Sequence, residues 1–172
     1  QEEVRLPQGR GKPLSIAIFA GGEMAIKARE AELVVINPAD IEDLGSDRQK
    51  ARKLARRHDF FLSEIPHMAD IGRHLGVVLG PRGKMPRPVP PNLDPGNIAQ
   101  ALQSTTLVRS RDNITFHTVV GARDQGDEAI SENAYEVWNR VTGKLERGAG
   151  NVRSLYVKTS MGPSIQVEVD YT

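Results

Sequence analysis

Short apolar runs alternate with helical segments between residues 15 and 104, and this alternation constrains the fold more than any other feature of the chain. The runs cover residues 15–20, 33–36 and 60–62. Continuous apolar runs of this kind are typical of strands that are covered on both faces. Helical patterns cover residues 23–31, 47–57, 66–79 and 96–104. Repeated strand–helix units predict a small parallel α/β domain.

After residue 106 the pattern changes to short β-rich runs around one long helix. The runs cover residues 106–109, 114–120, 152–159 and 165–169. The helix covers residues 128–141 and is expected to bury Ala129, Ile130, Ala134, Val137, Trp138 and Val141. This order predicts an α+β arrangement, in which helices pack on one face of a mainly antiparallel sheet. Residues 4–6 are expected to pair with that sheet, which makes the α/β region an insertion within an outer domain.

A rigid turn is predicted at Gly80-Pro81-Arg82-Gly83-Lys84-Met85-Pro86. Each proline fixes φ at about −65° and removes a backbone donor, while glycine permits positive φ. The turn is expected to hold Arg82 and Lys84 outward. Two interpretations stay open: a phosphate-binding turn, or a structural crossover whose cations keep it in solvent.

Composition excludes some classes of protein and leaves others open. The chain has no cysteine, which excludes a disulfide framework and a thiolate metal site. A net charge of +1 does not by itself indicate nucleic-acid binding, because electrostatic binders are usually more basic. No apolar run approaches the roughly 18 residues that cross a bilayer, so no membrane partner is expected. The chain opens at Gln1 without a methionine, and we expect its native N-terminal segment to be missing.

Two small groups have a functional and a structural interpretation. Gly21-Gly22 lies where a phosphate-binding turn would lie, between a strand and a helix. It lacks the G-x-G-x-x-G spacing, so a tight turn is the preferred interpretation. His67 and His74 are two helical turns apart without a third ligand, so no metal site is predicted.

Charged clusters are also open to two interpretations. Asp124, Asp127 and Glu128 are attributed to a helix N-terminus, whose dipole favours acidic side chains. The densest basic segment contains Arg48, Lys50, Arg52, Lys53, Arg56 and Arg57. A solvated helix face is the preferred interpretation of this segment, and a helix lying near phosphate is the alternative.

A strand and a glycine–proline turn are predicted at residues 154–164, near the C-terminus. The polar groups of this segment are mainly hydroxyls, beside a thioether and an unobstructed glycine backbone. Such groups suit an RNA minor groove, where 2′-hydroxyls and sugar edges are displayed. An ordinary hairpin turn is an equally good interpretation.

Three separated motifs together resemble the large-subunit ribosomal protein L-one family, in its archaeal form. They are Leu6-Pro7-Gln8-Gly9-Arg10-Gly11-Lys12, Leu79-Gly80-Pro81-Arg82-Gly83-Lys84-Met85-Pro86 and Tyr156-Val157-Lys158-Thr159-Ser160-Met161-Gly162-Pro163-Ser164. The resemblance implies an outer split β-α-β domain, made by residues 1–13 and 107–172 and lacking its N-terminal part. It also implies an inserted Rossmann-like parallel α/β domain at residues 14–106.

The resemblance implies a structural, non-enzymatic protein of the large ribosomal subunit in the cytoplasm. Its expected partners are rRNA at the base of the mobile stalk, the tRNA in the exit site and its own mRNA, whose translation it would repress. No cofactor or metal is expected, and the protein is expected to act as a monomer within the ribosome. The implied RNA-binding residues are Ser154, Thr159, Ser160, Met161 and Gly162, with Arg82 and Lys84 as a secondary contact to RNA or tRNA.

The chain departs from the family pattern at two places. Ser160 stands where threonine is common, which keeps the hydroxyl and loses a methyl contact. The segment Pro88-Val89-Pro90-Pro91 is richer in proline than the bacterial pattern.

A nucleotide- or phosphometabolite-binding α/β enzyme is the alternative function. It would use the Gly21-Gly22 turn and the loop at residues 80–86. A protein-interaction module working through the basic helix is a third interpretation. Hinges between the two domains are expected near Pro13 and residues 106–108.

Overall fold

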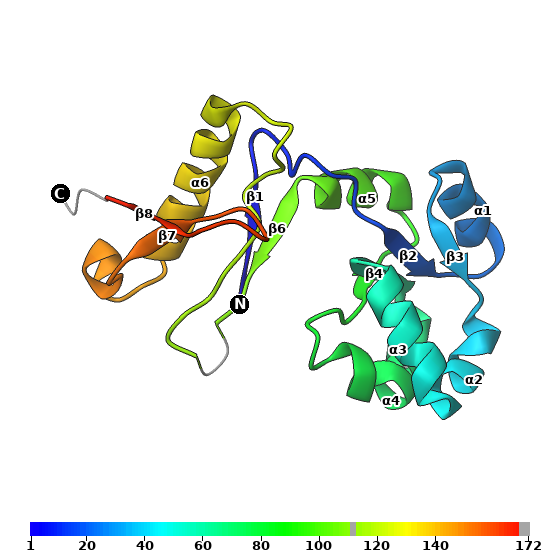
Figure 1. The fold of residues 1–172 in the computed structure, drawn as a ribbon. Coiled ribbons are helices and arrows are strands. Elements are labelled where there is room, and N and C mark those ends of the chain that lie inside the picture. The colour runs from blue at the N-terminus through cyan, green and yellow to red at the C-terminus, as the bar shows by residue number, and fades with distance from the viewer. Residues whose placement is uncertain (111–112, 169–172) are drawn as a thin grey trace. The chain divides into compact units, whose positions relative to one another are not determined.

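The structure is a computed structural model that describes residues 1–110 and 113–168. The chain divides into two compact units (Figure 1). Unit 1 combines Gln1–Lys12 with Ser104–Thr172, and unit 2 is Pro13–Gln103. No helix in the described ranges is long and apolar enough to cross a membrane.

Unit 2 contains a parallel sheet of four strands, as the alternating pattern predicts. The strands are β2 (Ile16–Phe19), β3 (Val34–Ile36), β4 (Phe60–Glu64) and β5 (Arg87–Val89). They are arranged in the order β3-β2-β4-β5, and each neighbouring pair is parallel. All four residues of β2 are buried, which fits a strand covered on both faces.

Helices cover both faces of this sheet (Figure 1). They are α1 (Gly22–Glu30), α2 (Ile41–Ser46), α3 (Arg48–Arg57), α4 (Met68–Leu79) and α5 (Pro95–Gln103), with short 3₁₀ turns η1 (Pro38–Asp40) and η2 (Ile65–His67). Successive strand residues face opposite sides. Ile16 and Ile18 therefore pack with α1 and α5, whereas Ala17 and Phe19 pack with α2, α3 and α4.

Two elements of unit 2 are missing from the sequence-based prediction. Strand β5 lies within a proline-rich segment for which the sequence predicts no strand. Pro88 is tolerated there because β5 is an edge strand, where a missing backbone donor costs little. Helix α2 is only six residues long, too short to give a clear periodic pattern.

Unit 1 is built around one long helix and two short antiparallel ladders. Its elements are β1 (Glu2–Arg5), β6 (Thr105–Val108), α6 (Asp127–Thr142), η3 (Gly148–Asn151), β7 (Leu155–Val157) and β8 (Ile165–Val167). Strand β1 pairs with β6, so the opening residues do join the later part of the chain. Val4, Leu6, Val108 and Val137 form the core between this ladder and α6.

The prediction of a single antiparallel sheet for this region is wrong. Strands β7 and β8 form a hairpin of their own, separate from the β1–β6 ladder. No strand forms among the described residues of 114–120. Thr118 instead meets β6 through its side chain, with its hydroxyl 2.8 Å from Thr106 Oγ1 and donating to the Leu107 carbonyl at 3.1 Å. The Thr118 hydroxyl thus connects this segment to β6, where the sequence predicted a strand paired through its backbone.

Candidate nucleic-acid interface

The hairpin formed by β7 and β8 carries most of the residues that the sequence nominates for RNA binding. Its register pairs Leu155 with Val167, Tyr156 with Gln166, and Val157 with Ile165. Directly paired residues share a face, and successive residues alternate between faces. One face of the hairpin is therefore apolar, and the opposite face carries Tyr156 and Gln166.

The polar face is the better candidate for RNA contact. By the same alternation, Ser154 and Lys158 lie on the face that carries Tyr156, a residue that is 52% exposed. This face combines a hydroxyl, a cation, an amide and an aromatic ring, which can read sugar hydroxyls and stack on an unpaired base. Tyr156 and Gln166 were not nominated from the sequence. The period-two alternation of residues 154–158 is the signal that could have found them.

The turn of the hairpin presents Ser160, Met161 and Gly162 at an exposed tip. The Gly162 amide donates to the Thr159 carbonyl at 3.1 Å, and Met161 is 98% exposed. A Cβ placed on Gly162 would collide with Thr159 Oγ1. A larger residue at position 162 would thus require the Thr159 side chain to move, and the two residues are packed together in the turn.

Ser154 does not join the residues of the turn in one cluster. It precedes β7, whereas Ser160 follows it, at the other end of the strand. Six residues of extended chain span roughly 20 Å, at about 3.3 Å per residue. The nominated residues therefore form a strip along the hairpin, which suits a groove or a strand of RNA better than a single bound nucleotide.

Lys84 does not point outward, and that expectation is wrong. Its ammonium donates to the carbonyls of Ala55 at 3.0 Å and His58 at 2.7 Å, at the C-terminal end of α3. A cation at this end of a helix satisfies unpaired carbonyls and complements the dipole. Arg82 is also partly anchored, because its Nη1 donates to the Val78 carbonyl at 2.9 Å.

His58 is buried beside the Lys84 contact, with 3% of the residue exposed. Its Nδ1 lies 2.8 Å from the Ser15 hydroxyl. Burial lowers the pKa of His58 below its ordinary value, and the nearby cations Arg57 and Lys84 act in the same direction. Asp59 opposes this effect on the pKa. His58 is thus a neutral structural residue and no part of a surface site.

The first family motif is a structural loop held by two amide side chains of unit 1. Asn133, on α6, accepts from the Gln8 amide at 3.0 Å and donates to the carbonyls of Gly9 and Val120 at 2.8 Å each. Gln125 donates to the Gln8 carbonyl at 2.9 Å. Gly11 has φ +76°, and a Cβ there would lie 2.6 Å from that of Ala122. Gly11 therefore serves close packing, whereas Gly9 has open space around it and serves its backbone conformation, with φ +67°.

The turn that could have held a phosphate is occupied by the chain's own carboxylate. The Gly21 amide, at the start of α1, donates to Glu64 Oε2 at 3.2 Å. The same carboxylate oxygen lies 3.2 Å from His67 Nε2. Because this carboxylate already takes the amide that would receive an anion, the turn is poorly suited to a nucleotide phosphate.

His67 and His74 also fall into separate environments. His67 precedes α4 and meets Glu64, whereas the His74 backbone and Cβ lie against Gly45 of α2. Asp127 and Glu128 lie in the first turn of α6, as the helix-terminus interpretation predicts. Within the described residues, no group of three His, Asp or Glu side chains is arranged to hold a metal.

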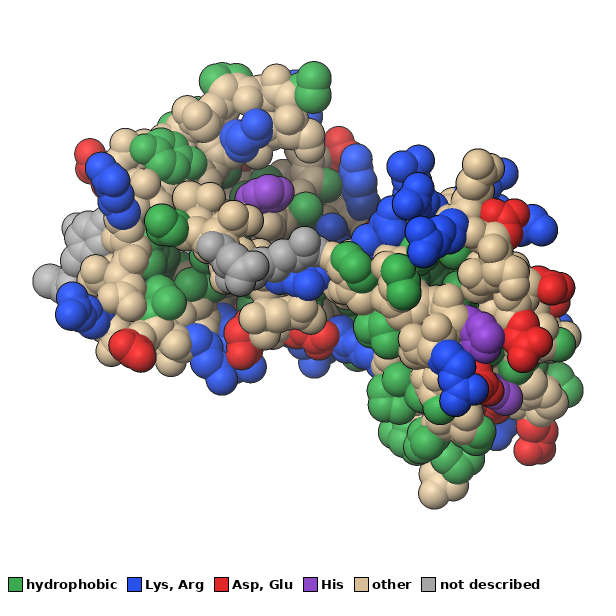
Figure 2. All heavy atoms as spheres, turned by 90° about the horizontal axis from the view of Figure 1, so that it is seen from below, with side chains coloured by type: hydrophobic (Ala, Val, Ile, Leu, Met, Phe, Trp, Pro, Cys, Tyr) green, Lys and Arg blue, Asp and Glu red, His purple; other side chains and the backbone are tan. Residues whose placement is uncertain are grey.

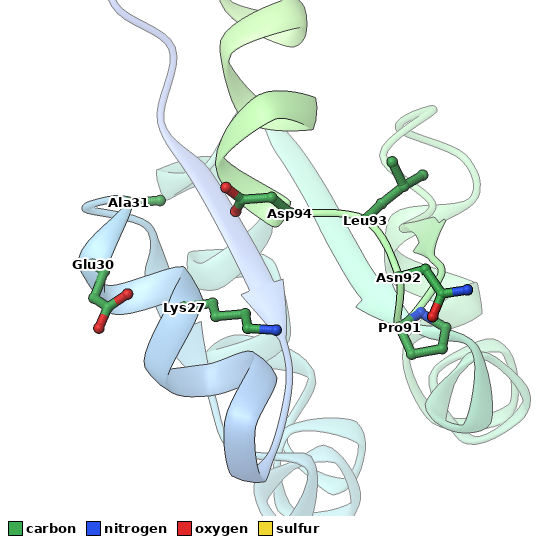
Figure 3. A pocket seen from close by; sticks show the side chains of 7 residues that line it. All are labelled: Lys27, Glu30, Ala31, Pro91, Asn92, Leu93 and Asp94. Carbon is green, nitrogen blue, oxygen red and sulfur yellow. The ribbon is translucent and has the colours of Figure 1, made fainter.

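A hollow in unit 2 also lacks the features of a substrate site (Figure 3). It measures about 480 Å³ and lies between α1 and the segment that precedes α5. Lys27 and Glu30 line one side, and Asp94 comes from the other (Figure 3). The hollow is open to solvent, and its lining carries charges of both signs that are not directed at one group of a ligand.

Comparison with known proteins places the chain among ribosomal proteins, a class without enzymatic activity. The chain belongs to the ribosomal protein L1p/L10e family, whose model matches residues 1–163. This confirms the resemblance drawn from the three motifs, including its archaeal character.

Similar proteins include several from archaea that are named large ribosomal subunit protein uL1. The protein of Thermoplasma acidophilum is 47% identical over 97% of this chain and 77% of its own length. That of Methanopyrus kandleri is 47% identical over 96% of this chain and 78% of its own length. The protein of Archaeoglobus fulgidus is 47% identical over 95% of this chain and 77% of its own length.

Proposed function

We propose that this chain is a structural protein of the large ribosomal subunit that binds rRNA through unit 1. The observation that carries the proposal is the polar, hydroxyl-bearing face of the β7–β8 hairpin, in a chain whose family consists of ribosomal proteins. The outer domain would comprise residues 1–13 and 107–172, and the inserted Rossmann-like domain residues 14–106. Ser154, Thr159, Ser160, Met161 and Gly162 would form the RNA-binding strip.

The finer function follows from the family resemblance. The RNA would be the rRNA at the base of the mobile stalk, and the exit-site tRNA would be a second partner whose release the protein assists. Binding of a similar element in its own mRNA would repress translation. The protein would work as a monomer within the cytoplasmic ribosome. No step of this function requires catalysis or a cofactor.

A binding titration with the stalk-base rRNA fragment tests the proposal. Met161→Asp should weaken binding by about 3 kcal/mol, roughly a hundredfold, because it places a carboxylate in an RNA contact without a partner. Filter binding measures this affinity, with an unrelated hairpin of equal length as the competitor. Gly162→Val is a less clean variant, since its side chain would also collide with Thr159.

Met85→Asp is the matched control, because Met85 is an exposed methionine of unit 2. It should leave the affinity for the stalk-base fragment unchanged. Equal binding by the wild-type protein and Met161→Asp would refute the assignment of the hairpin turn. Equal affinity for the fragment and the unrelated hairpin would refute stalk-base rRNA as the specific ligand.

A further inference from the structure

Unit 2 contains a groove whose polar lining is entirely arginine. It measures about 250 Å³ and lies between helices α3 and α4. Its lining residues are Arg48, Arg52, Arg56, Val77, Val78 and Arg82. Figure 2 shows Lys and Arg side chains gathered on one part of this unit's surface in the view drawn. The groove therefore concentrates positive charge in a protein whose net charge is only +1.

The three arginines of α3 form a regular row. Positions 48, 52 and 56 are four residues apart, so they share one face of the helix and follow one another at about 6 Å along its axis. All three are exposed, and none makes an ion pair with a carboxylate in the described part of the chain. Like charges at this spacing repel one another, and a bound anion would relieve that cost.

Arg82 and Val77 complete the groove on the side of α4. The hydrogen bond from Arg82 to the Val78 carbonyl fixes this guanidinium in place and leaves its other donors available. Val77 is 70% exposed and gives the groove an apolar wall. Among the described residues, none that lines the groove is acidic.

We propose that this groove binds the sugar–phosphate backbone of RNA, as a second RNA surface distinct from the hairpin of unit 1. Guanidinium groups bind phosphate with two parallel hydrogen bonds, and the repeat along α3 suits consecutive phosphates of one strand. Val77 would contact a ribose face. An acidic peptide is the less suitable occupant, because the groove has no deep apolar pocket to receive an anchoring side chain.

The test compares two triple variants of the full chain on an RNA duplex that lacks the stalk-base sequence. Arg48→Gln/Arg52→Gln/Arg56→Gln should weaken binding by about tenfold at moderate salt. The affinity should also become less sensitive to salt. The negative slope of log affinity against log salt concentration should become shallower by about 2 to 3, because each lost phosphate contact reduces its magnitude by slightly less than one. Lys27→Gln/Lys50→Gln/Lys53→Gln removes the same charge outside the groove and should leave the slope nearly unchanged.

The outcomes separate this site from the hairpin. Met161→Asp should leave duplex binding intact, so a failure of the hairpin assignment does not affect this test. Equal losses in both triple variants would overturn the proposal in favour of a diffuse charge effect. An unchanged slope in the arginine variant would also overturn it. Competition by polyglutamate that is stronger than competition by RNA would identify an acidic protein partner and overturn it as well.

Discussion

Asn133 shows how one buried polar residue organises unit 1. It is fully buried, and its amide connects α6 with the loop after β1 and with the segment at Val120. Only an amide offers an acceptor and two donors in this arrangement. The helical pattern placed apolar residues on this face and missed Asn133, because polar residues are normally expected on the solvent side.

Asn133→Ala should lower the free energy of unfolding of unit 1 by about 3 kcal/mol. The substitution removes three hydrogen bonds, one from the Gln8 amide and two to the carbonyls of Gly9 and Val120, and each contributes about 1 kcal/mol. Urea unfolding followed by circular dichroism measures the change. Asn139→Ala, at an exposed position of the same helix, is the control and should cost much less. Equal effects of the two substitutions would contradict the role given to Asn133.

His58 predicts a pH dependence of stability. The pKa of His58 in the folded protein is lowered, mainly by burial. As the pH falls, the unfolded chain therefore binds a proton at this residue before the folded chain does. The free energy of unfolding should therefore decrease as pH falls through about 6.5 towards the lowered pKa of the folded protein. Above that window His58 is neutral in both states and has no such effect.

Urea unfolding at pH 7.5 and pH 5.5 tests the contribution of His58. His58→Gln should remove part of the loss of stability at the lower pH. His117→Gln, at an exposed histidine of unit 1, should not change it. An identical pH dependence in wild type and His58→Gln would show that other groups determine it.

At the scale of elements, the loop at residues 80–86 is a connection that stabilises its neighbours. It leads from α4 to β5, and Lys84 contacts the end of α3 on the way. The two cations that suggested one phosphate site thus separate: Lys84 is used within the fold, and Arg82 lines the groove between α3 and α4.

Lys84→Met should lower the free energy of unfolding by about 1 to 2 kcal/mol, because the carbonyls at the end of α3 lose a charged donor. Thermal unfolding measures the change, and Lys53→Met, an exposed position on the same helix, is the control. RNA affinity at a temperature where both variants are folded should be unaffected. A weaker RNA affinity with unchanged stability would instead make Lys84 a direct contact.

At the scale of the whole molecule, the two units differ in the chemistry of their proposed RNA surfaces. The region at residues 14–106 has 12 Lys and Arg against 11 Asp and Glu, and six of these cations lie in α3. The rest of the chain has no net charge, since its 11 basic residues are balanced by 11 acidic ones. Contact through the hairpin would thus depend on fit and hydrogen bonding and vary little with salt, whereas contact through the arginine groove would vary strongly.

Much of the architecture could be predicted from the sequence, because its signals are local. The apolar run at residues 15–20 marks the buried strand β2, and Asp127 and Glu128 mark the start of α6. The run at residues 33–36 also forms a strand, but β3 lies at the edge of the sheet and none of its residues is buried. The order of strands and helices also indicates the parallel sheet. The three motifs sufficed to identify the family, since each is a contiguous string of residues.

Only the tertiary structure decided what the individual polar groups contact. Glu64 meets Gly21 across 43 positions of sequence, and Lys84 reaches Ala55 across 29. Contacts over such separations depend on how strands and helices pack, which no local pattern records. The alternation of strands and helices thus determined the parallel sheet. Packing of α3 against α4 brought Arg82 beside the three arginines of α3, because only the tertiary structure places the end of α4 next to that helix face.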